Sequence, residues 1–145
     1  FVNSHKDLDE VKKIIGNNSF VISKIETNNA IINLDKIIKN SDALLIDRGD
    51  LSRYIPIEKI PVAQEKIINR STKLKKPTYV ATNLLESMIK ENQPTRAESH
   101  DVYSTLREGA KGLVLAAETA IGKNPIECVR FIKRCIAVYK KNKNK

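Results

Sequence analysis

The sequence predicts an α/β fold in which helices cover a parallel sheet. Short apolar runs alternate with amphipathic helical patterns along the whole chain. Most of the apolar runs lack alternating polar residues, which is typical of parallel strands that are buried on both faces. We count five such β/α units in the sequence, whereas a closed barrel of this kind needs eight. The chain is therefore expected to form an open sheet, or part of a barrel that another part completes.

The first half of the chain predicts three strands and three helices. The strands are expected at residues 1–3, 20–24 and 43–46, and the helices at residues 7–15, 28–38 and 61–68. The first helix should end at Gly16 and bury one apolar face. This face consists of Leu8, Val11, Ile14 and Ile15. Asn28 or Asn29 should cap the second helix, a loop should cover residues 48–56, and Pro61 should open the third helix.

The second half predicts two more β/α units. Strands are expected at residues 78–81 and 112–115, a helical turn at residues 84–89, and helices at residues 98–108 and from Pro125 onward. Gly109 should end the first of these helices. The last helix should bury the apolar face formed by Val129, Ile132, Ile136 and Tyr139. Residues 1–139 are expected to form one domain, and residues 140–145 a solvated tail rich in lysine and asparagine.

The composition is that of a soluble globular protein. The 145 residues carry a net charge of +9, with a mean hydropathy of −0.36. No apolar run is long enough to span a bilayer and no signal-peptide pattern is present, so we expect a cytoplasmic protein without membrane contact. The lysines are dispersed and tryptophan is absent, which argues against nucleic acid as a partner. Cys128 and Cys135 are expected to be free thiols, without a zinc site.

Polar residues follow the predicted strands, at the edge where parallel barrels place their active sites. Glu26 and Asp50 are carboxylates that suit Mg²⁺, and Lys24 would stabilise charge on a substrate oxygen. Gly49 would let a ligand approach the backbone, and the Thr82 hydroxyl would orient a substrate or relay a proton. The alternative interpretation is that these are solvated charges on loops, because any α/β protein has polar loop ends.

Several motifs occur together in one order and spacing. They are Ile22-Ser23-Lys24-Ile25-Glu26, Arg48-Gly49-Asp50-Leu51, the segment of residues 81–89, Pro94-Thr95-Arg96-Ala97-Glu98, and Glu118-Thr119-Ala120-Ile121-Gly122. Over essentially the whole chain, this series resembles the pyruvate kinase family. The resemblance implies a partial TIM-type (β/α)8 barrel that contains about the last five β/α units. It also implies phosphoryl transfer between phosphoenolpyruvate and ADP, giving pyruvate and ATP.

The resemblance assigns roles to the residues at the strand ends. It implies that Lys24 and Thr82 are catalytic, and that Lys24, Gly49, Asp50 and Thr82 contact the substrate. Glu26 and Asp50 would bind Mg²⁺ or Mn²⁺, and no other cofactor is expected on this part of the barrel. The first three strands of the family barrel, which carry the K⁺ site and nucleotide contacts, have no counterpart here. K⁺ and ADP or ATP are therefore expected only with a complementing barrel half, and the partner is expected to be that half or a second copy.

The sequence also departs from the family pattern at and near the expected site. Asp47 stands where the family has a small residue, Ala116-Ala117 replaces a serine-glycine pair, and Asn83 replaces a glutamine. Ser52, Lys111 and Gly112 depart as well. These differences leave two alternatives to a phosphotransferase. One is a non-catalytic or regulatory module on a degenerate barrel, and the other is a metal-dependent lyase or aldolase that acts on a pyruvate-like acid.

Overall fold

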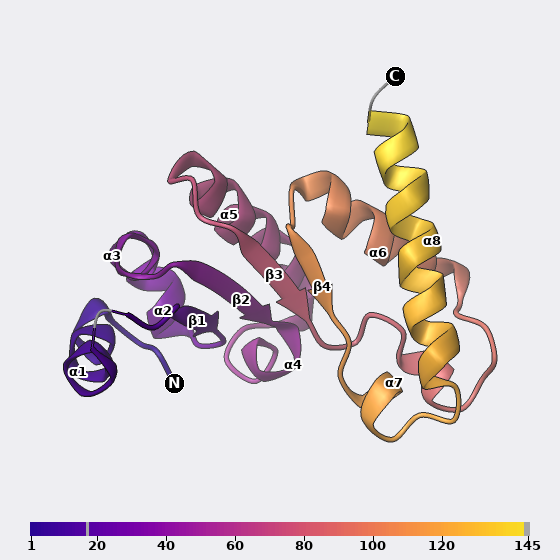
Figure 1. Cartoon of the computed structure of the whole chain (residues 1–145), viewed down its shortest axis with the longest axis horizontal. Helices are drawn as coiled ribbons and strands as arrows, with labels where there is room; N and C mark the ends of the chain where they lie inside the picture. The colour runs from indigo at the N-terminus through magenta and orange to yellow at the C-terminus, as the bar shows by residue number, and fades with distance from the viewer. Residues whose placement is uncertain (17, 144–145) are drawn as a thin grey trace.

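Four parallel strands form one open sheet in the computed structural model, which describes residues 1–16 and 18–143 (Figure 1). The strands are β1 (Ile22–Ile25), β2 (Ala43–Asp47), β3 (Thr78–Ala81) and β4 (Gly112–Val114), and their order in the sheet is β1-β2-β3-β4. The register pairs Ile25 with Ile46 and Asp47 with Ala81. The predicted α/β fold with a parallel sheet is confirmed, and the sheet is not closed.

Residues 1–3 are not a strand, so the described residues contain four strands where the sequence predicted five. Side chains satisfy the backbone of Asn3 instead of a neighbouring strand. Its N–H donates to Asp7 Oδ2 at 2.7 Å, and its carbonyl accepts from Asn33 Nδ2 at 3.0 Å. With both backbone groups of Asn3 occupied, this segment has little to gain from pairing with β1.

Ten helical segments connect and flank the strands in the described residues. They are α1 (His5–Ile15), α2 (Asn28–Ile32), α3 (Leu34–Asn40), α4 (Arg48–Leu51), η1 (Ile57–Lys59), α5 (Ile60–Lys73), η2 (Glu86–Ile89), α6 (Arg96–Glu108), α7 (Ala117–Ala120) and α8 (Pro125–Lys143). Gly16 and Gly109 end α1 and α6 at positive φ, as predicted. Helix α5 begins one residue before Pro61, which lies in its first turn.

Three predicted boundaries are wrong, each because a polar side chain bonds to the backbone. Thr27 caps α2 in place of Asn28 or Asn29, since its hydroxyl accepts the Ala30 N–H at 3.1 Å. The helix predicted over residues 28–38 is divided at Asn33, whose side chain bonds to the Asn3 carbonyl. The predicted loop begins with α4, because the carboxylate of Asp47 caps this short helix.

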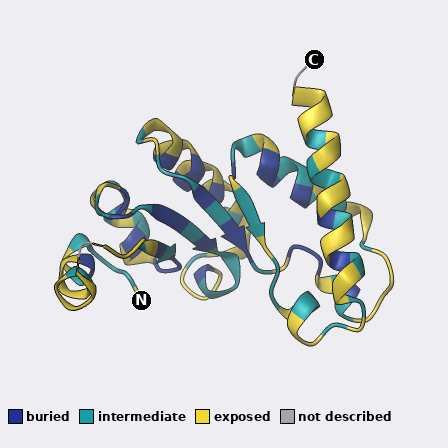
Figure 2. Ribbon diagram, in the orientation of Figure 1, coloured by how far each residue is buried: buried dark blue, intermediate teal, exposed yellow. Residues whose placement is uncertain are grey.

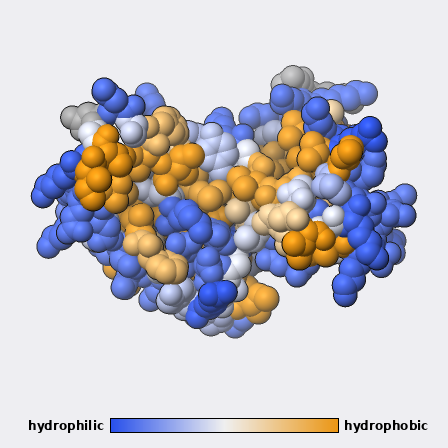
Figure 3. All heavy atoms as spheres, turned by 60° about the horizontal axis from the view of Figure 1, so that its bottom comes forward, coloured by the Kyte–Doolittle hydropathy of each residue, from blue (hydrophilic) through white to orange (hydrophobic). Residues whose placement is uncertain are grey.

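The apolar face predicted for α1 is mostly exposed. Leu8 is buried in the core, whereas Ile14 is 85% exposed and Val11 and Ile15 are only partly covered. Figure 2 shows that most of α1 is exposed. Helix α1 lies at the edge of the molecule and packs mainly against α3, so no second element among the described residues covers its far side. Figure 3 shows hydrophobic side chains at the surface in several patches, including the end of the molecule that holds α1.

The last helix continues where the sequence predicted a tail. Helix α8 runs without interruption to Lys143, and the rest of the expected tail, residues 144 and 145, lies outside the described residues. Of the predicted apolar face, Ile132 is buried and Val129 is exposed. Both cysteines are free thiols, with Cys128 buried, as predicted. No helix in the described part of the chain has the length and apolar character to cross a membrane.

Candidate active site

The residues that follow β1, β2 and β3 meet at one edge of the sheet. Parallel strands in register end at the same edge, so Glu26 and Thr82, which directly follow β1 and β3, are brought together with Asp47, the last residue of β2. Helix α4 starts directly after β2 and turns Asp50 back toward this edge. The structure therefore gathers Lys24, Glu26, Gly49, Asp50 and Thr82, the residues that the sequence singled out.

The Lys24 ammonium group lies among three carboxylates. Its Nζ is 2.8 Å from Glu26, 3.0 Å from Asp47 and 3.9 Å from Asp50. The Lys24 side chain is 44% exposed, whereas that of Glu26 is only 5% exposed. The hydrogen bond to Glu26 raises the pKa of Lys24 most, burial opposes it, and Asp47 adds to the rise. Lys24 is therefore a firmly charged cation that reaches solvent at the carboxylate cluster.

Asp47 belongs to this cluster, whereas the sequence indicated it only as a departure from the family pattern beside the expected site. Its Oδ1 accepts the Asp50 N–H at 3.3 Å and caps α4, while its Oδ2 faces Lys24. Burial is the largest influence on the Asp47 carboxyl and raises its pKa, but Lys24, the Asp50 N–H and the Thr82 hydroxyl together lower the pKa below its ordinary value. The signal available in the sequence was an acidic residue at the end of a buried strand, one position before Arg48.

The Thr82 hydroxyl joins the loop after β3 to the loop after β2. It accepts the Gly49 N–H at 2.8 Å, and its Oγ1 lies 2.6 Å from the Ala81 carbonyl and 3.3 Å from Asp47 Oδ1. These two oxygens are alternative acceptors for the single hydroxyl proton. A Cβ on Gly49 would lie 3.4 Å from Thr82 Oγ1, an ordinary van der Waals contact, so this bond does not itself require glycine. Thr82 has a φ of 69°, which is strained for a β-branched residue.

Arg48 holds the same loops from the side of α6, a role that sequence reasoning did not assign. Its Nε and Nη2 donate to the Thr82 carbonyl at 3.1 and 2.8 Å, and Nη1 pairs with Asp101 of α6 at 2.8 Å. The Arg48 side chain is only 11% exposed. Its guanidinium group therefore positions the Thr82 segment without facing the carboxylate cluster. An arginine directly after a buried strand was the available signal.

The end of the fourth strand does not join the cluster. Glu118 is buried, and its two carboxylate oxygens accept the N–H groups of Leu85 and Ala116 at 3.2 and 2.9 Å. These bonds tie α7 to the segment before η2. Glu118 thus has a structural role in the described residues.

The three carboxylates have the chemistry of a divalent cation site. One oxygen each from Glu26, Asp47 and Asp50 lies within 4.8 Å of the others. The Glu26 carboxylate is buried, and among the described residues its Oε2 pairs only with Lys24, at 2.8 Å. A buried carboxylate in such a cluster fits a metal ligand, since carboxylate oxygens are the ligands that Mg²⁺ prefers.

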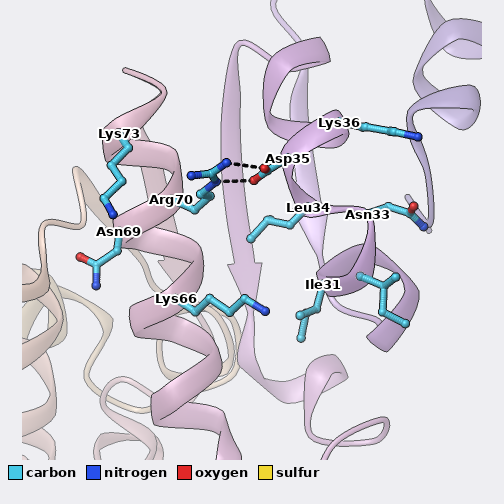
Figure 4. A pocket seen from close by; sticks show the side chains of 10 residues that line it. Ile31, Asn33, Leu34, Asp35, Lys36, Lys66, Asn69, Arg70 and Lys73 are labelled. Atoms are coloured by element: carbon cyan, nitrogen blue, oxygen red, sulfur yellow. Dashed lines mark hydrogen bonds and ion pairs between the residues drawn. The ribbon is translucent and has the colours of Figure 1, made fainter.

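A groove lies elsewhere, on the outer surface between α3 and α5 (Figure 4). It has a volume of about 730 Å³ and is lined by Lys36, Lys66 and Lys73, together with the ion pair between Asp35 and Arg70. None of the residues that the sequence singled out lines it. Exposed lysines on two neighbouring helices are typical of a solvated face, so we do not assign a site to this groove.

Comparison with known proteins gives matches over nearly the whole chain. The sequence model of the pyruvate kinase barrel domain matches residues 1–129. A pyruvate kinase of Thermotoga maritima is 44% identical over 137 residues, which are 92% of this chain and 29% of that protein. The chloroplastic pyruvate kinase isozyme G of Ricinus communis is 45% identical over 135 residues, 91% of this chain and 32% of that protein. The chain thus spans about a third of the length of these relatives.

Proposed function

The chain belongs to the pyruvate kinase family, and from this we propose that it supplies the metal- and acid-binding part of a phosphotransferase site. The observation that carries the proposal is the position of Lys24, whose ammonium group contacts Glu26 and Asp50 at the carboxyl ends of the strands. The substrate would be phosphoenolpyruvate, or pyruvate in the reverse direction. The open four-stranded sheet would be part of a (β/α)8 barrel.

Each residue has a task that follows from its position. Lys24 would neutralise negative charge on the transferring phosphoryl group or on the enolate oxygen that develops as the phosphoryl group leaves. Glu26 and Asp50 would hold Mg²⁺ or Mn²⁺, which supplies charge neutralisation for substrate oxygens. The N–H groups of Gly49 and Asp50 would receive the substrate carboxylate. The Thr82 hydroxyl would lie beside the carbon that gains a proton.

The nucleotide is proposed to bind outside this chain. The chain spans less than a third of the Thermotoga maritima relative, so contacts to ADP or ATP and to K⁺ would come from the other barrel strands. Phosphoryl transfer depends on positioning both substrates and on electrostatic stabilisation, which half a site does not provide. We therefore expect no phosphoryl transfer by this chain alone. Turnover at family-like rates in a purified sample would contradict this expectation.

The sheet itself suggests a partner. Within the described residues, β1 and β4 are the outer strands, and each is paired on one side only. Unpaired edges of a parallel sheet are templates for further strands. The partner would be the complementing barrel half or a second copy of the chain.

One observation favours the alternative of a non-catalytic or regulatory module. Asp47 brings a third carboxylate to Lys24, at 3.0 Å, where a negatively charged acid would have to bind. A module of this kind would bind a protein partner without needing a divalent metal, which distinguishes it from the first proposal.

Titration calorimetry with oxalate, which imitates the enolate of pyruvate, tests the proposal. We expect binding in the presence of Mg²⁺ or Mn²⁺, and loss of binding in Glu26→Gln and Asp50→Asn. The matched control is Glu58→Gln, because Glu58 is an exposed carboxylate on η1 outside the cluster. Circular dichroism would show that each variant is folded. Oxalate binding that is unaffected by Glu26→Gln would overturn the proposed site.

A further inference from the structure

Asp47 already bonds to groups that an acidic substrate would use. Its Oδ2 lies 3.0 Å from the Lys24 ammonium group, and its Oδ1 accepts the Asp50 N–H at 3.3 Å. The same Oδ1 is 3.3 Å from the Thr82 hydroxyl oxygen. The remaining expected donor, the Gly49 N–H, bonds to Thr82 Oγ1. The donors expected to receive the substrate carboxylate are therefore occupied by side chains of the chain itself.

We propose that Asp47 is a built-in carboxylate that competes with the substrate's acid group for Lys24 and the Asp50 N–H. This inference rests on the proposed function, because it concerns the same acid-binding position. An incoming acid has to displace the Asp47 side chain from Lys24 and from the N-terminus of α4. Asp47 thus lowers the affinity of the site for carboxylic acids and determines which acids can enter.

The local charge also lowers the affinity of the site for an acid. Lys24 contributes one formal positive charge, while Glu26, Asp47 and Asp50 contribute three negative ones. Charges at separations of 3–4 Å interact strongly where water is partly excluded. The extra carboxylate of Asp47 therefore repels a dianionic acid as well as occupying its donors. Removing this one charge would favour anion binding on both grounds.

A different role for Asp47, as a third metal ligand, fits the contacts less well. Both Asp47 oxygens are engaged, one by Lys24 and the other by the Asp50 N–H. By contrast, the Glu26 carboxylate has one partner among the described residues, Lys24, which lies 2.8 Å from Oε2. Glu26 thus has fewer contacts to give up than Asp47 on binding a cation.

Two substitutions separate the charge of Asp47 from its capping role. Asp47→Ser keeps an oxygen that can cap α4, but it is too short to reach Lys24. Asp47→Asn keeps the shape and removes the charge. We expect Asp47→Ser to raise oxalate affinity in the presence of Mg²⁺ by on the order of tenfold, which corresponds to one charge-assisted hydrogen bond. Asp47→Asn should give a smaller increase in oxalate affinity, because the amide group still lies beside Lys24 and the Asp50 N–H.

The experiment measures oxalate binding calorimetrically for the unmodified chain and for both variants, each with and without Glu26→Gln. Binding of Mn²⁺ alone, followed by electron paramagnetic resonance, is the second readout. Asp9→Ser is the control, because it removes one exposed carboxylate from α1. Tighter oxalate binding in Asp47→Ser, abolished by Glu26→Gln and absent from the control, would support the inference.

Two results would overturn the inference, and they differ in what they leave standing. If oxalate binding depends on Glu26 but is equal or weaker in both Asp47 variants, the inference fails and the proposed function remains. Weaker Mn²⁺ binding in both variants would then identify Asp47 as a metal ligand. If neither the unmodified chain nor a folded Asp47→Ser variant binds oxalate, the inference and the proposed acid site both fail.

Discussion

The Thr82 hydroxyl accepts the backbone N–H of Gly49 at 2.8 Å, although the two residues lie 33 positions apart in different β/α loops. This bond fixes the loop after β2 against the loop after β3 at the edge of the sheet where the carboxylates gather. The bond also occupies a backbone donor that we propose for the substrate carboxylate. The geometry of the candidate site therefore depends in part on this hydroxyl group.

Thr82→Val should destabilise the fold by about 1–2 kcal/mol, because it leaves the Gly49 N–H without its acceptor. Valine keeps the β-branch, so the strain at the positive φ of residue 82 stays the same. Thr82→Ser is the matched control, since it keeps the hydroxyl. Urea denaturation measures both variants, and an equal loss of stability in the two would contradict the role assigned to the hydroxyl.

Arg48→Lys should cost about 2 kcal/mol of unfolding free energy. The arginine serves the Thr82 carbonyl and Asp101 at once, and a lysine has no planar fork that could do so. Arg53→Lys provides the comparison, because Arg53 is 76% exposed and pairs with Asp50 at 3.4 Å. It should change stability by less than about 0.5 kcal/mol. Similar effects of the two substitutions in a urea titration would argue against the structural role of Arg48.

The dependence of stability on pH should change in Glu98→Gln. Burial is the largest influence on Glu98 and raises its pKa, but the hydroxyl and N–H groups of Ser87 and Thr95 lower the pKa below its ordinary 4.5. The unfolded chain then binds more protons, so Glu98 stabilises the fold above its unfolded pKa, and this contribution is lost as the pH falls through the folded pKa. In Glu98→Gln, stability should fall less steeply between about pH 5 and pH 3.

The pKa of Glu108 is shifted in the opposite direction, so its effect on the pH dependence of stability should also be opposite. Burial raises the pKa of its carboxyl above 4.5, and the hydrogen bond from Gln64 only partly offsets this. Here the folded chain binds more protons, so stability decreases as the pH rises from the unfolded pKa through the folded one. Glu108→Gln keeps an acceptor for Gln64 and should raise stability near pH 7. Thermal unfolding across this pH range measures both variants, and a shift of the same sign in the two would refute the assignment.

The unpaired side of β1, an outer strand of the sheet, should cause association of the isolated chain. Ile22 of β1 and the neighbouring Phe20 are exposed hydrophobic residues at this edge. Ile22→Lys should reduce association, because a charged side chain on an edge strand opposes further pairing. Ile121→Lys is the control, since Ile121 is also exposed but lies beside α7. Sedimentation velocity measures the effect, and a stable monomer with one cooperative melt in the unmodified chain would count against a required partner.

Local patterns in the sequence predicted most of the elements correctly. The strands around Leu44 and Val80 and the glycine ends of α1 and α6 depend on residues close together in the chain. The misplaced caps at Thr27 and Asp47 depended on residues three positions away, whereas two other failures depended on distant partners. The segment of residues 1–3 bonds to Asn33 instead of to a strand, and the far face of α1 lacks an element to cover it.

The sequence by itself determined the α/β alternation and the positions of Lys24, Glu26, Asp50 and Thr82. Side-chain periodicity identifies strands and helices, and parallel strands necessarily end at one edge, so the residues after them come together. Only the tertiary structure decided how these residues bond to one another. The contact of Asp47 with Lys24 spans 23 residues, counted from their positions, and it depends on the register of two strands. That register results from packing across the whole sheet, which no local pattern specifies.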